Sequence, residues 1–510
     1  MKLYRLDNIK LSPTSDDGEL KRMAARALGH EPLYFRILKK SLDARRKNDI
    51  HWVCSIEYGD EFPPAQEPLG RLDRPRRVYV VGSGPAGLFC AVRLADRGFS
   101  PVVIERGERV EERTESVKRF FGGGELDENS NVQFGEGGAG TFSDGKLNTQ
   151  THSGFNADVY RTFVRFGAPE DTLYLNKPHI GSDVLKGVVG NMREHIIKAG
   201  GEVRFGTLFS GFIARGGRLC AVRLKNIADG REREEPADDV VLATGHSARD
   251  TFGVLAECGL AVEPREFAVG VRIEHAQQDI NRAQYGDVKG LPAADYKAVS
   301  TVSDRRVFTF CMCPGGYVMA ASSERGGVVT NGMSDRARDG ENANSALMVQ
   351  LRYSDFPHDG ITAGIDYQRA LERKAFALGG GDYRAPAQTV GDFLKGGDGG
   401  KAGAVIPTYP RGVTFAPLTE LFPRYVTDPL KVAIKDIGKR IRGFDAADGI
   451  LTAAETRFTS PLRFLRDDTF QSVSVRGVYP CGEGSGYSGG ITSSAADGIR
   501  IAEALHAKYK

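Results

Sequence analysis

The stretch VYVVGSGPAGLFCAVRLADRGFSPVVIE, from Val78 to Glu105, decides the fold. The apolar run Val78 to Val81 predicts a buried parallel strand, and the glycine-rich turn from Gly82 to Gly87 follows it directly. A helix over Leu88 to Arg97 comes next, and a second strand over Pro101 to Ile104 leads to the acidic residue that ends the stretch. This order of strand, turn, helix, strand and acid is typical of a dinucleotide-binding unit.

The residues of the turn have separate physical tasks. Gly82 permits the tight turn, Gly84 lets the backbone approach a diphosphate, and Gly87 lets the helix pack closely on the strand. The amino terminus of the helix directs free amides and positive partial charge at the phosphates, and Glu105 can accept hydrogen bonds from ribose hydroxyls. The residues assigned to this part of a cofactor site are Gly82, Ser83, Gly84, Pro85, Ala86, Gly87, Glu105 and Arg106.

Composition narrows the class of protein. With 510 residues, of which 40% are hydrophobic and 26% charged, the chain is expected to form two or three globular domains. The net charge of +3 does not favour a nucleic-acid or membrane partner. No apolar run is long enough for a membrane span, and the amino terminus lacks a signal-type segment, so a cytoplasmic protein is expected. Seven cysteines without zinc-like or CxxC spacing predict reduced, mostly buried thiols and no metal site.

Residues 1–70 are expected to form a small N-terminal α+β domain. Strand-like runs cover Leu3 to Leu11, Leu33 to Leu38 and Ile50 to Tyr58, and Gly18 to Leu28 reads as a short helix. This domain also carries a cluster of basic residues near the single tryptophan, Trp52. The basic residues are Lys39, Lys40, Arg45, Arg46 and Lys47.

The basic cluster has two interpretations. It could bind RNA or an acidic partner protein, or it could be a solvated hairpin tip over a core tryptophan. The second interpretation is favoured, and nothing else in the sequence supports a nucleic-acid or protein partner for this domain.

A second glycine-rich loop, FGEGGAGTFSDGKL, runs from Phe134 to Leu147. Each glycine costs backbone entropy on folding, so this density favours successive amides that wrap an anion over mere flexibility. An irregular surface loop is the alternative. Beside the first turn, the loop would complete a cofactor pocket, with hydroxyl and ammonium contacts from Thr141, Ser143 and Lys146. The residues assigned here are Gly138, Ala139, Gly140, Thr141 and Lys146.

The remaining chain returns twice to the nucleotide-binding domain. Val240 to Gly245 and Gly477 to Gly484 read as short buried strands that end in glycines. The predicted fold is α/β: a Rossmann-type domain assembled from discontinuous segments, with an inserted α+β substrate domain and the small N-terminal domain. Its segments are 75–151, 238–261 and 471–510 for the cofactor-binding domain, and 152–237 and 262–470 for the insert, the latter with an antiparallel sheet.

Four distant motifs carry a family resemblance. They are VGSGPAG with Glu105, GEGGAGTFSDGKL from Gly135, LATGHSARDT from Leu242, and YPCGEGSGYSGGITSSAADG from Tyr479. The pattern resembles the two-dinucleotide-binding-domain flavoproteins, and more closely a family of FAD-dependent dehydrogenases related to geranylgeranyl-reductase-like flavoproteins. The resemblance covers nearly the whole chain and implies FAD as the cofactor.

The resemblance also implies further cofactor contacts. Ala243, Thr244 and Gly245 would lie near the adenine and ribityl side, and the last motif would hold the flavin through Gly482, Glu483, Gly489, Gly490 and Ile491. Glutamate at position 483 departs from the commoner aspartate. Independently of the resemblance, a helix that begins near Ile491 would place positive partial charge where a reduced flavin accumulates negative charge.

The electron route is constrained by what the sequence lacks. No second strand-GxGxxG-helix unit occurs between Gly201 and Gly477, so NAD(P)H is possible only as a transient reductant. A protein donor, or the substrate itself, could supply the hydride instead. Cys311 and Cys313 alternate along one predicted strand and would face the same side. Core packing in a sheet is favoured for this pair, and a thiol pair that acts on substrate is the alternative.

The leading hypothesis is an FAD-dependent oxidoreductase that acts on a small molecule by hydride transfer. Candidates for substrate handling are Arg272, Glu274, His179 and Tyr317, which could clamp an anion or move a proton, with structural ion pairs as the alternative. Two other functions stay open: flavin-dependent RNA modification, and a non-catalytic flavin redox sensor that docks a partner through the N-terminal domain.

Overall fold

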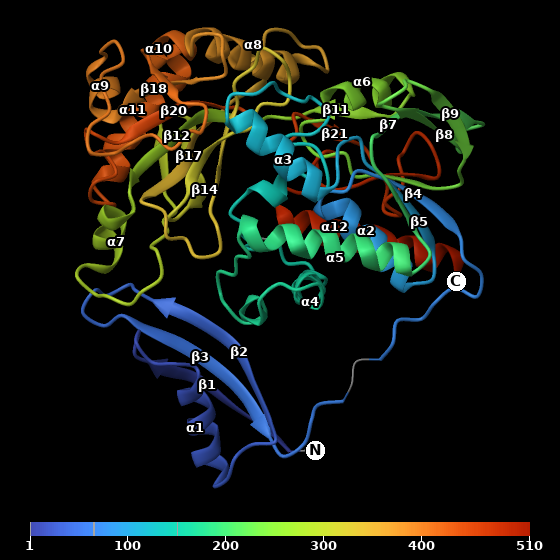
Figure 1. Cartoon of the computed structure of the whole chain (residues 1–510), viewed down its shortest axis with the longest axis horizontal. Helices are drawn as coiled ribbons and strands as arrows, with labels where there is room; N and C mark the ends of the chain where they lie inside the picture. The colour runs from blue at the N-terminus through green and yellow to red at the C-terminus, as the bar shows by residue number, and fades with distance from the viewer. Residues whose placement is uncertain (1, 65–66, 150) are drawn as a thin grey trace.

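A five-stranded parallel sheet forms the centre of the nucleotide-binding domain in the computed structural model, which describes residues 2–64, 67–149 and 151–510 (Figure 1). Its strands are apolar and largely buried on both faces, as expected for a parallel sheet with both faces covered. Their spatial order is β22 (Val478–Pro480), β10 (Val240–Leu242), β4 (Arg77–Val81), β5 (Ser100–Ile104) and β6 (Glu202–Arg204). The chain therefore returns to this sheet from segments far apart in sequence.

Two different layers cover the faces of this sheet. Helices pack on one face, where Val78, Val80 and Val241 point into their core. An antiparallel three-stranded sheet and a helix pack on the other face, against Tyr79 and Val81. The helical layer is α2 (Pro85–Asp96), α4 (Asn156–Arg165), α5 (Ser182–Lys198) and α12 (Ile491–Tyr509); the opposite layer is β7 (Thr207–Arg215), β8 (Arg218–Asn226), β9 (Glu232–Pro236) and α6 (Arg249–Glu257).

This arrangement corrects one part of the predicted domain division. Residues 152–237 were expected to begin the inserted substrate domain, but α5, β6 and the sheet β7–β9 belong to the nucleotide-binding unit. The reason is long-range pairing: β6 adds to the edge of the parallel sheet beside β5, with Val103 opposite Val203. Local periodicity predicts the element but not the sheet that it joins.

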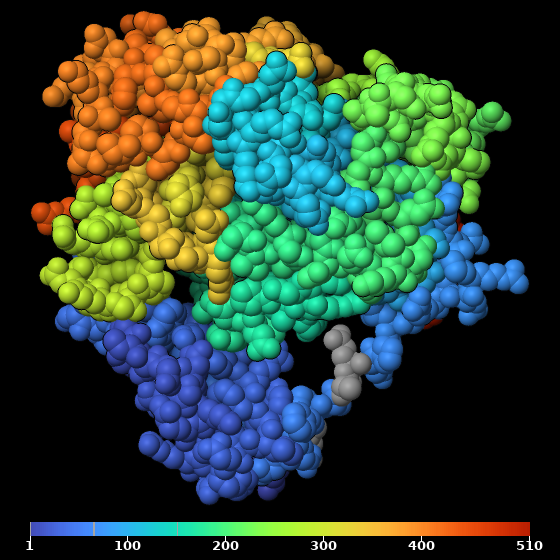
Figure 2. Space-filling model, viewed as in Figure 1, coloured from blue at the N-terminus to red at the C-terminus, as the bar shows by residue number. Residues whose placement is uncertain are grey.

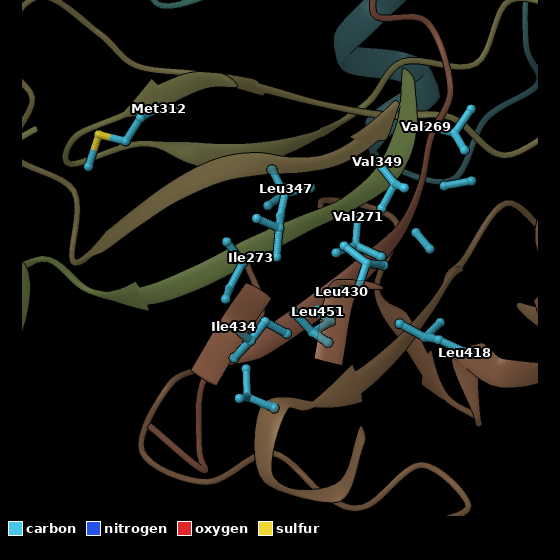
Figure 3. Close-up of a cluster of buried hydrophobic side chains, with 14 of the residues drawn as sticks. Val269, Val271, Ile273, Met312, Leu347, Val349, Leu418, Leu430, Ile434 and Leu451 are labelled. Carbon is cyan, nitrogen blue, oxygen red and sulfur yellow. The ribbon is translucent and has the colours of Figure 1, made fainter. Parts of the chain in front are cut away.

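A seven-stranded sheet forms the core of the second large region. One of its faces packs on α11 (Arg424–Gly438), where Leu430 and Ile434 meet Val271 and Leu347 (Figure 3). The sheet order is β13 (Val299–Val302), β14 (Arg305–Cys313), β17 (Asn342–Gln350), β12 (Ala268–Ala276), β20 (Ile450–Glu455), β18 (Ala385–Thr389) and β19 (Val413–Phe415). Its other face is turned toward the nucleotide-binding domain.

Shorter elements join these two units. The helices are α3 (Val110–Phe121), α7 (Gln277–Tyr285), α8 (Ala363–Leu378), α9 (Val390–Lys395) and α10 (Leu418–Leu421). The strand pairs are β11 (Val262–Pro264) with β21 (Leu462–Phe464), and β15 (Tyr317–Ala320) with β16 (Thr330–Met333). No helix in the described part of the chain combines the length and the apolar character needed to cross a membrane.

The N-terminal domain lies beside the two larger units (Figures 1 and 2). It consists of β1 (Leu3–Leu11), α1 (Gly18–Leu28), β2 (Tyr34–Asp43) and β3 (His51–Gly59), in the strand order β1-β3-β2. The edge strand β2 meets the main body: the Lys40 amide donates to the Tyr174 carbonyl at 2.8 Å, and the Asn176 amide donates to the Lys40 carbonyl at 2.9 Å. Backbone pairing therefore fixes this domain to the rest of the chain.

Two of the five residues of the basic cluster, Lys40 and Arg45, are engaged within this domain. The Lys40 ammonium pairs with Asp17 at 2.5 Å and lies 4.9 Å from the centroid of the partly buried Trp52 ring. Arg45 pairs with Asp43 and, with Arg46 and Lys47, lies in the exposed turn between β2 and β3. These contacts favour the interpretation of the cluster as a solvated hairpin tip.

Candidate active site

The turn after β4 contains positions at which only glycine fits, because a Cβ atom there would clash with neighbouring backbone. Gly82 has a φ of 98°, and a Cβ there would lie 2.3 Å from the carbonyl oxygen of Ala243. A Cβ on Gly87 would lie 1.9 Å from the carbonyl oxygen of Gly82, so the first turn of α2 packs directly on the loop. At Gly84, by contrast, a Cβ would meet only the Cα of Gly138, at 3.8 Å. The backbone is thus open at the one position where a diphosphate must approach.

Glu105 ties the end of β5 to this turn. Its Oε2 accepts hydrogen bonds from the Ser83 amide at 3.0 Å and the Ser83 hydroxyl at 2.6 Å, and its Oε1 accepts from the Gly107 amide at 2.9 Å. Arg106 stacks over Phe134 and pairs with Asp250, while its buried Nε has no acceptor among the described residues. This guanidinium keeps one donor for a ligand.

The second glycine-rich loop is organised by a buried arginine that the sequence analysis missed. Arg113, on α3, donates to the carbonyl oxygens of Asn131 at 2.9 Å, Glu136 at 2.6 Å and Gly138 at 3.0 Å. It is fully buried, and burial lowers its pKa to about 10. Its helical spacing from Val110 and Val117, which places it on the apolar face of α3, was a usable signal of burial, but only the tertiary fold shows that loop carbonyls surround it.

The carboxyl-terminal motif approaches the same region from the opposite side. Asp497 of α12 accepts from the Gly482 amide at 2.9 Å and forms a bidentate pair with Arg466, at 2.8 and 2.9 Å. These bonds fix the turn that presents Glu483. Burial raises the pKa of the Glu483 carboxyl to about 8, with Arg265 opposing the rise, so this side chain is largely protonated at neutral pH and can donate a hydrogen bond.

These segments line one cavity of about 920 Å³. Most of the cofactor residues expected from the sequence lie on its wall, whereas Gly87, Thr141 and Gly482 lie behind it. Those on the wall are Gly82, Ser83, Gly84, Pro85, Ala86, Glu105, Arg106, Gly138, Ala139, Gly140, Lys146, Ala243, Thr244, Gly245, Glu483, Gly489, Gly490 and Ile491. The first turn of α12, Ile491 to Ser494, also lines this space, and amides at a helix amino terminus are free to bind a ligand.

The expected candidates for substrate handling do not line the cavity. Arg272 is buried in a bidentate pair with Glu455, and Glu274 accepts from Thr408 and Asn342. The His179 ring contacts the carbonyl of Arg336 at 3.1 Å, and Tyr317 is exposed outside the cavity. The polar atoms of Arg272, Glu274 and His179 are thus engaged by other residues of the protein.

The cysteine pair also differs from the favoured expectation. A bulge between Phe310 and Cys313 interrupts the pairing of β14 with β17, and Cys311 adopts a φ of 42°. Cys313 is buried and donates to the Cys311 carbonyl at 3.2 Å, whereas Cys311 is exposed, and both line the cavity. Enclosure raises the pKa of the Cys311 thiol to about 12, so it is protonated at neutral pH.

Several wall residues were not found from the sequence. His246, directly after the alanine-threonine-glycine strand, is held neutral because burial and the nearby Arg457 and Arg249 lower its pKa to about 3. The inner face of the large sheet adds Phe308 and Phe310. Their alternation with Val307 and Thr309 was a usable signal, since one face of a strand between two domains must contact a ligand or the partner domain.

Comparisons with known proteins agree with this geometry. Residues 266–458 match a family model described as the C-terminal domain of an FAD-dependent protein, and residues 80–132 match an NAD(P)-binding Rossmann-like domain. Residues 4–58 match a domain of unknown function. The fold, the cavity and the first of these matches define an FAD-dependent oxidoreductase.

The chain is 42% identical, over 534 aligned residues, to a protein of Clostridium beijerinckii described as an uncharacterized protein, with 99% of each chain covered. The chain belongs to the same family of FAD-dependent flavoproteins.

The solved structures to which the chain is similar are more distant. The glycerol-3-phosphate dehydrogenase of Bacillus halodurans complexed with FAD is 12% identical with a TM-score of 0.37, and 86% of this chain and 65% of that chain are covered. A geranylgeranyl bacteriochlorophyll reductase-like protein of Thermoplasma acidophilum is 11% identical with a TM-score of 0.35, with 86% and 80% covered.

Proposed function

We propose that the enzyme transfers hydride between FAD, held by the glycine-rich loops, and a small molecule bound in the same cavity against the large sheet. One observation carries this proposal: a single cavity joins the turn after β4 to the inner face of β14. Residues 262–470 would then act as the substrate domain, because they supply the sheet that closes the cavity opposite the loops.

The proposed placement of FAD follows from the donors on the wall. The diphosphate would lie at Gly84 and the amino terminus of α2, with ribose hydroxyls at Glu105 and Arg106. The adenine and ribityl side would meet Ala243 to Gly245, and the isoalloxazine would lie against Lys146 and the segment Gly489 to Ile491. When bound, FAD supplies an acceptor or donor of hydride.

Two features of the chain suit an anionic cofactor with several hydroxyls. Gly245 and Gly489 have nothing within 4 Å of an added Cβ, so the backbone is accessible both at the expected adenine and ribityl side and at the expected isoalloxazine position. The protonated Glu483 carboxyl can donate to a diphosphate oxygen, which an ionised carboxylate would repel, and it can also form a hydrogen bond with a ribityl hydroxyl.

We further propose that NAD(P)H acts only as a transient reductant and that the enzyme works in the cytoplasm. The seven cysteines are unpaired thiols, which supports a reducing compartment. The contacts of Lys40 and Arg45 within the N-terminal domain give no support to an RNA substrate, so the proposal is limited to small molecules.

The test is anaerobic reduction of the loaded enzyme. Purified protein is expected to carry one FAD per chain, and its visible absorbance is followed after addition of NADH, NADPH and a panel of small-molecule reductants and oxidants. Turnover with at least one small molecule supports the proposal. A bound flavin that no donor reduces and no acceptor reoxidises contradicts it and favours a redox sensor.

A further inference from the structure

The inner face of the large sheet carries an aromatic wall. Arg306, Phe308 and Phe310 alternate along β14 and line the cavity, whereas Val307, between them, is buried in the core beneath the opposite face. The Phe310 and Phe458 rings meet edge to face, with centroids 4.5 Å apart. Both phenylalanines of β14 are only partly buried, so the wall offers apolar surface to the cavity.

The base of this wall is firmly packed. Phe308 contacts Phe458 with a centroid distance of 5.5 Å, and the three rings rest on Ala268, Ala346 and Met348 of neighbouring strands. Rings held in this way present a rigid surface, which suits a flat or compact apolar group.

Two cations without partners lie along the same wall. Arg306 precedes Phe308 on its own face of β14, and Lys297 lies just before the paired strand β13; both are exposed and line the cavity. Neither side chain forms a hydrogen bond, ion pair or ring contact within residues 2–64, 67–149 and 151–510. Neighbouring cations are paired: Arg305 binds Asp355 at 2.6 and 2.7 Å, and Lys177 binds Asp295 at 2.7 Å.

The far end of the wall reaches the glycine-rich loop. Cys311 follows Phe310 on β14, and the Lys146 ammonium from that loop is near enough to influence its thiol. Val299 of β13 pairs with Phe308 and Thr301 with Arg306, so Lys297 lies beside Phe310, and Arg306 lies at the end of the wall away from Cys311. The two free cations therefore flank the rings, and the wall runs from the expected flavin position to Arg306.

We propose that the cavity selects an anionic small molecule with an apolar body, whose body lies against Phe308, Phe310 and Phe458 and whose carboxylate or similar group is bound by Arg306 at the end of the wall, with Lys297 adding positive charge beside the rings. This assignment rests on the proposed function, because it shares the cavity with FAD. An anionic ligand explains why neither cation has a protein partner, and the rings between Arg306 and Lys146 separate its anionic group from the expected flavin position.

The experiment uses FAD-loaded protein and three probes: 2-naphthoate, the uncharged 2-naphthamide, and acetate, which lacks the apolar body. Binding is measured by calorimetry and by the change in bound flavin absorbance. We expect 2-naphthoate to bind at least about tenfold more tightly than either other probe. The double variant Arg306→Met/Lys297→Met should weaken 2-naphthoate binding by about tenfold or more and leave 2-naphthamide unaffected.

The matched control is Arg215→Met/Lys198→Met, which removes two exposed cations that do not line the cavity and should leave binding unchanged. Both double variants alter exposed side chains, so FAD content and thermal unfolding should match the wild type. Equal binding of 2-naphthoate and 2-naphthamide, or no binding of 2-naphthoate by loaded enzyme, overturns the substrate class while the proposed function stands. Protein that holds no FAD overturns both.

Discussion

The Arg272 guanidinium forms a bidentate ion pair with the Glu455 carboxylate, at 3.1 Å from Nε to Oε2 and 3.0 Å from Nη2 to Oε1. Arg272 is fully buried on β12, and Glu455 lies on the cavity wall at the end of β20. Burial disfavours the charged arginine, but the carboxylate outweighs this effect and raises its pKa. The ion pair therefore fixes a residue of the cavity wall to the buried part of the sheet.

Breaking this pair should destabilise the fold strongly. Arg272→Met leaves a buried carboxylate without its partner, so we expect the free energy of unfolding to fall by about 3–5 kcal/mol. Removing both charges in Arg272→Met/Glu455→Met should restore much of the loss. Denaturant unfolding of these two variants, of Glu455→Met and of the wild type gives a double-mutant cycle. If the effects of the two single changes on the free energy of unfolding are additive, the two residues do not interact.

Arg113 should be irreplaceable by lysine. Its guanidinium bonds five loop carbonyls from Asn131 to Gly138, and an ammonium has only three donors. Arg113→Lys is expected to lower the free energy of unfolding by about 3 kcal/mol because buried carbonyls lose their partners. Arg119→Lys, at an exposed position of the same helix, should have little effect, and thermal unfolding that ranks the two variants equally would contradict this account.

The cofactor loops could be predicted from the sequence because some of their positions have no room for a Cβ atom and therefore require glycine. Gly82 and Gly87 are required by contacts of 2.3 and 1.9 Å, and such needs appear directly as residue types at fixed spacing. The catalytic candidates failed for the opposite reason. The charge of Arg272 is as visible in sequence as that of Arg306, yet only the fold shows that one is paired and buried and the other free.

The same limit explains the domain boundary and the cysteine pair. The periodicity of α5 predicts its length, but only the pairing of β6 with β5 assigns that segment to the parallel sheet. Strict alternation predicted equal environments for Cys311 and Cys313, and the bulge before Cys313 breaks that alternation.

Glu483 should make stability depend on pH. Its pKa rises from 4.5 to about 8 in the fold, so the folded protein keeps a proton that the unfolded chain has released between these values. Its contribution to the free energy of unfolding is therefore complete below pH 4.5, and this contribution is lost as the pH rises through 8. Glu483→Gln cannot titrate, so between pH 5 and pH 8 it should gain on the order of 3 kcal/mol relative to wild type in FAD-free protein. Parallel stability curves for the two proteins would refute the assigned pKa.

Alanine substitutions at two helical glycines distinguish the effect of close packing on stability from the effect of intrinsic helix propensity. Gly87→Ala should destabilise the protein and reduce FAD retention, because the new methyl group would lie 1.9 Å from the Gly82 carbonyl oxygen. Gly187→Ala, on the exposed face of α5 with nothing within 4 Å, should stabilise the protein by about 0.5–1 kcal/mol. Thermal unfolding and flavin content check both, and a neutral Gly87→Ala would contradict the packing described.

Gly84→Ala tests the central claim most directly, because the fold tolerates a Cβ there and a cofactor would not. Gly84 has a φ of −73°, and an added Cβ meets only the Cα of Gly138, at 3.8 Å. The measurement is the dissociation constant of FAD for wild-type and Gly84→Ala protein, each stripped of flavin. We expect unchanged thermal unfolding without FAD and an affinity at least about tenfold weaker in the variant, since the methyl group occupies the path of the diphosphate. Equal FAD affinity in the two proteins would contradict a cofactor site at this turn.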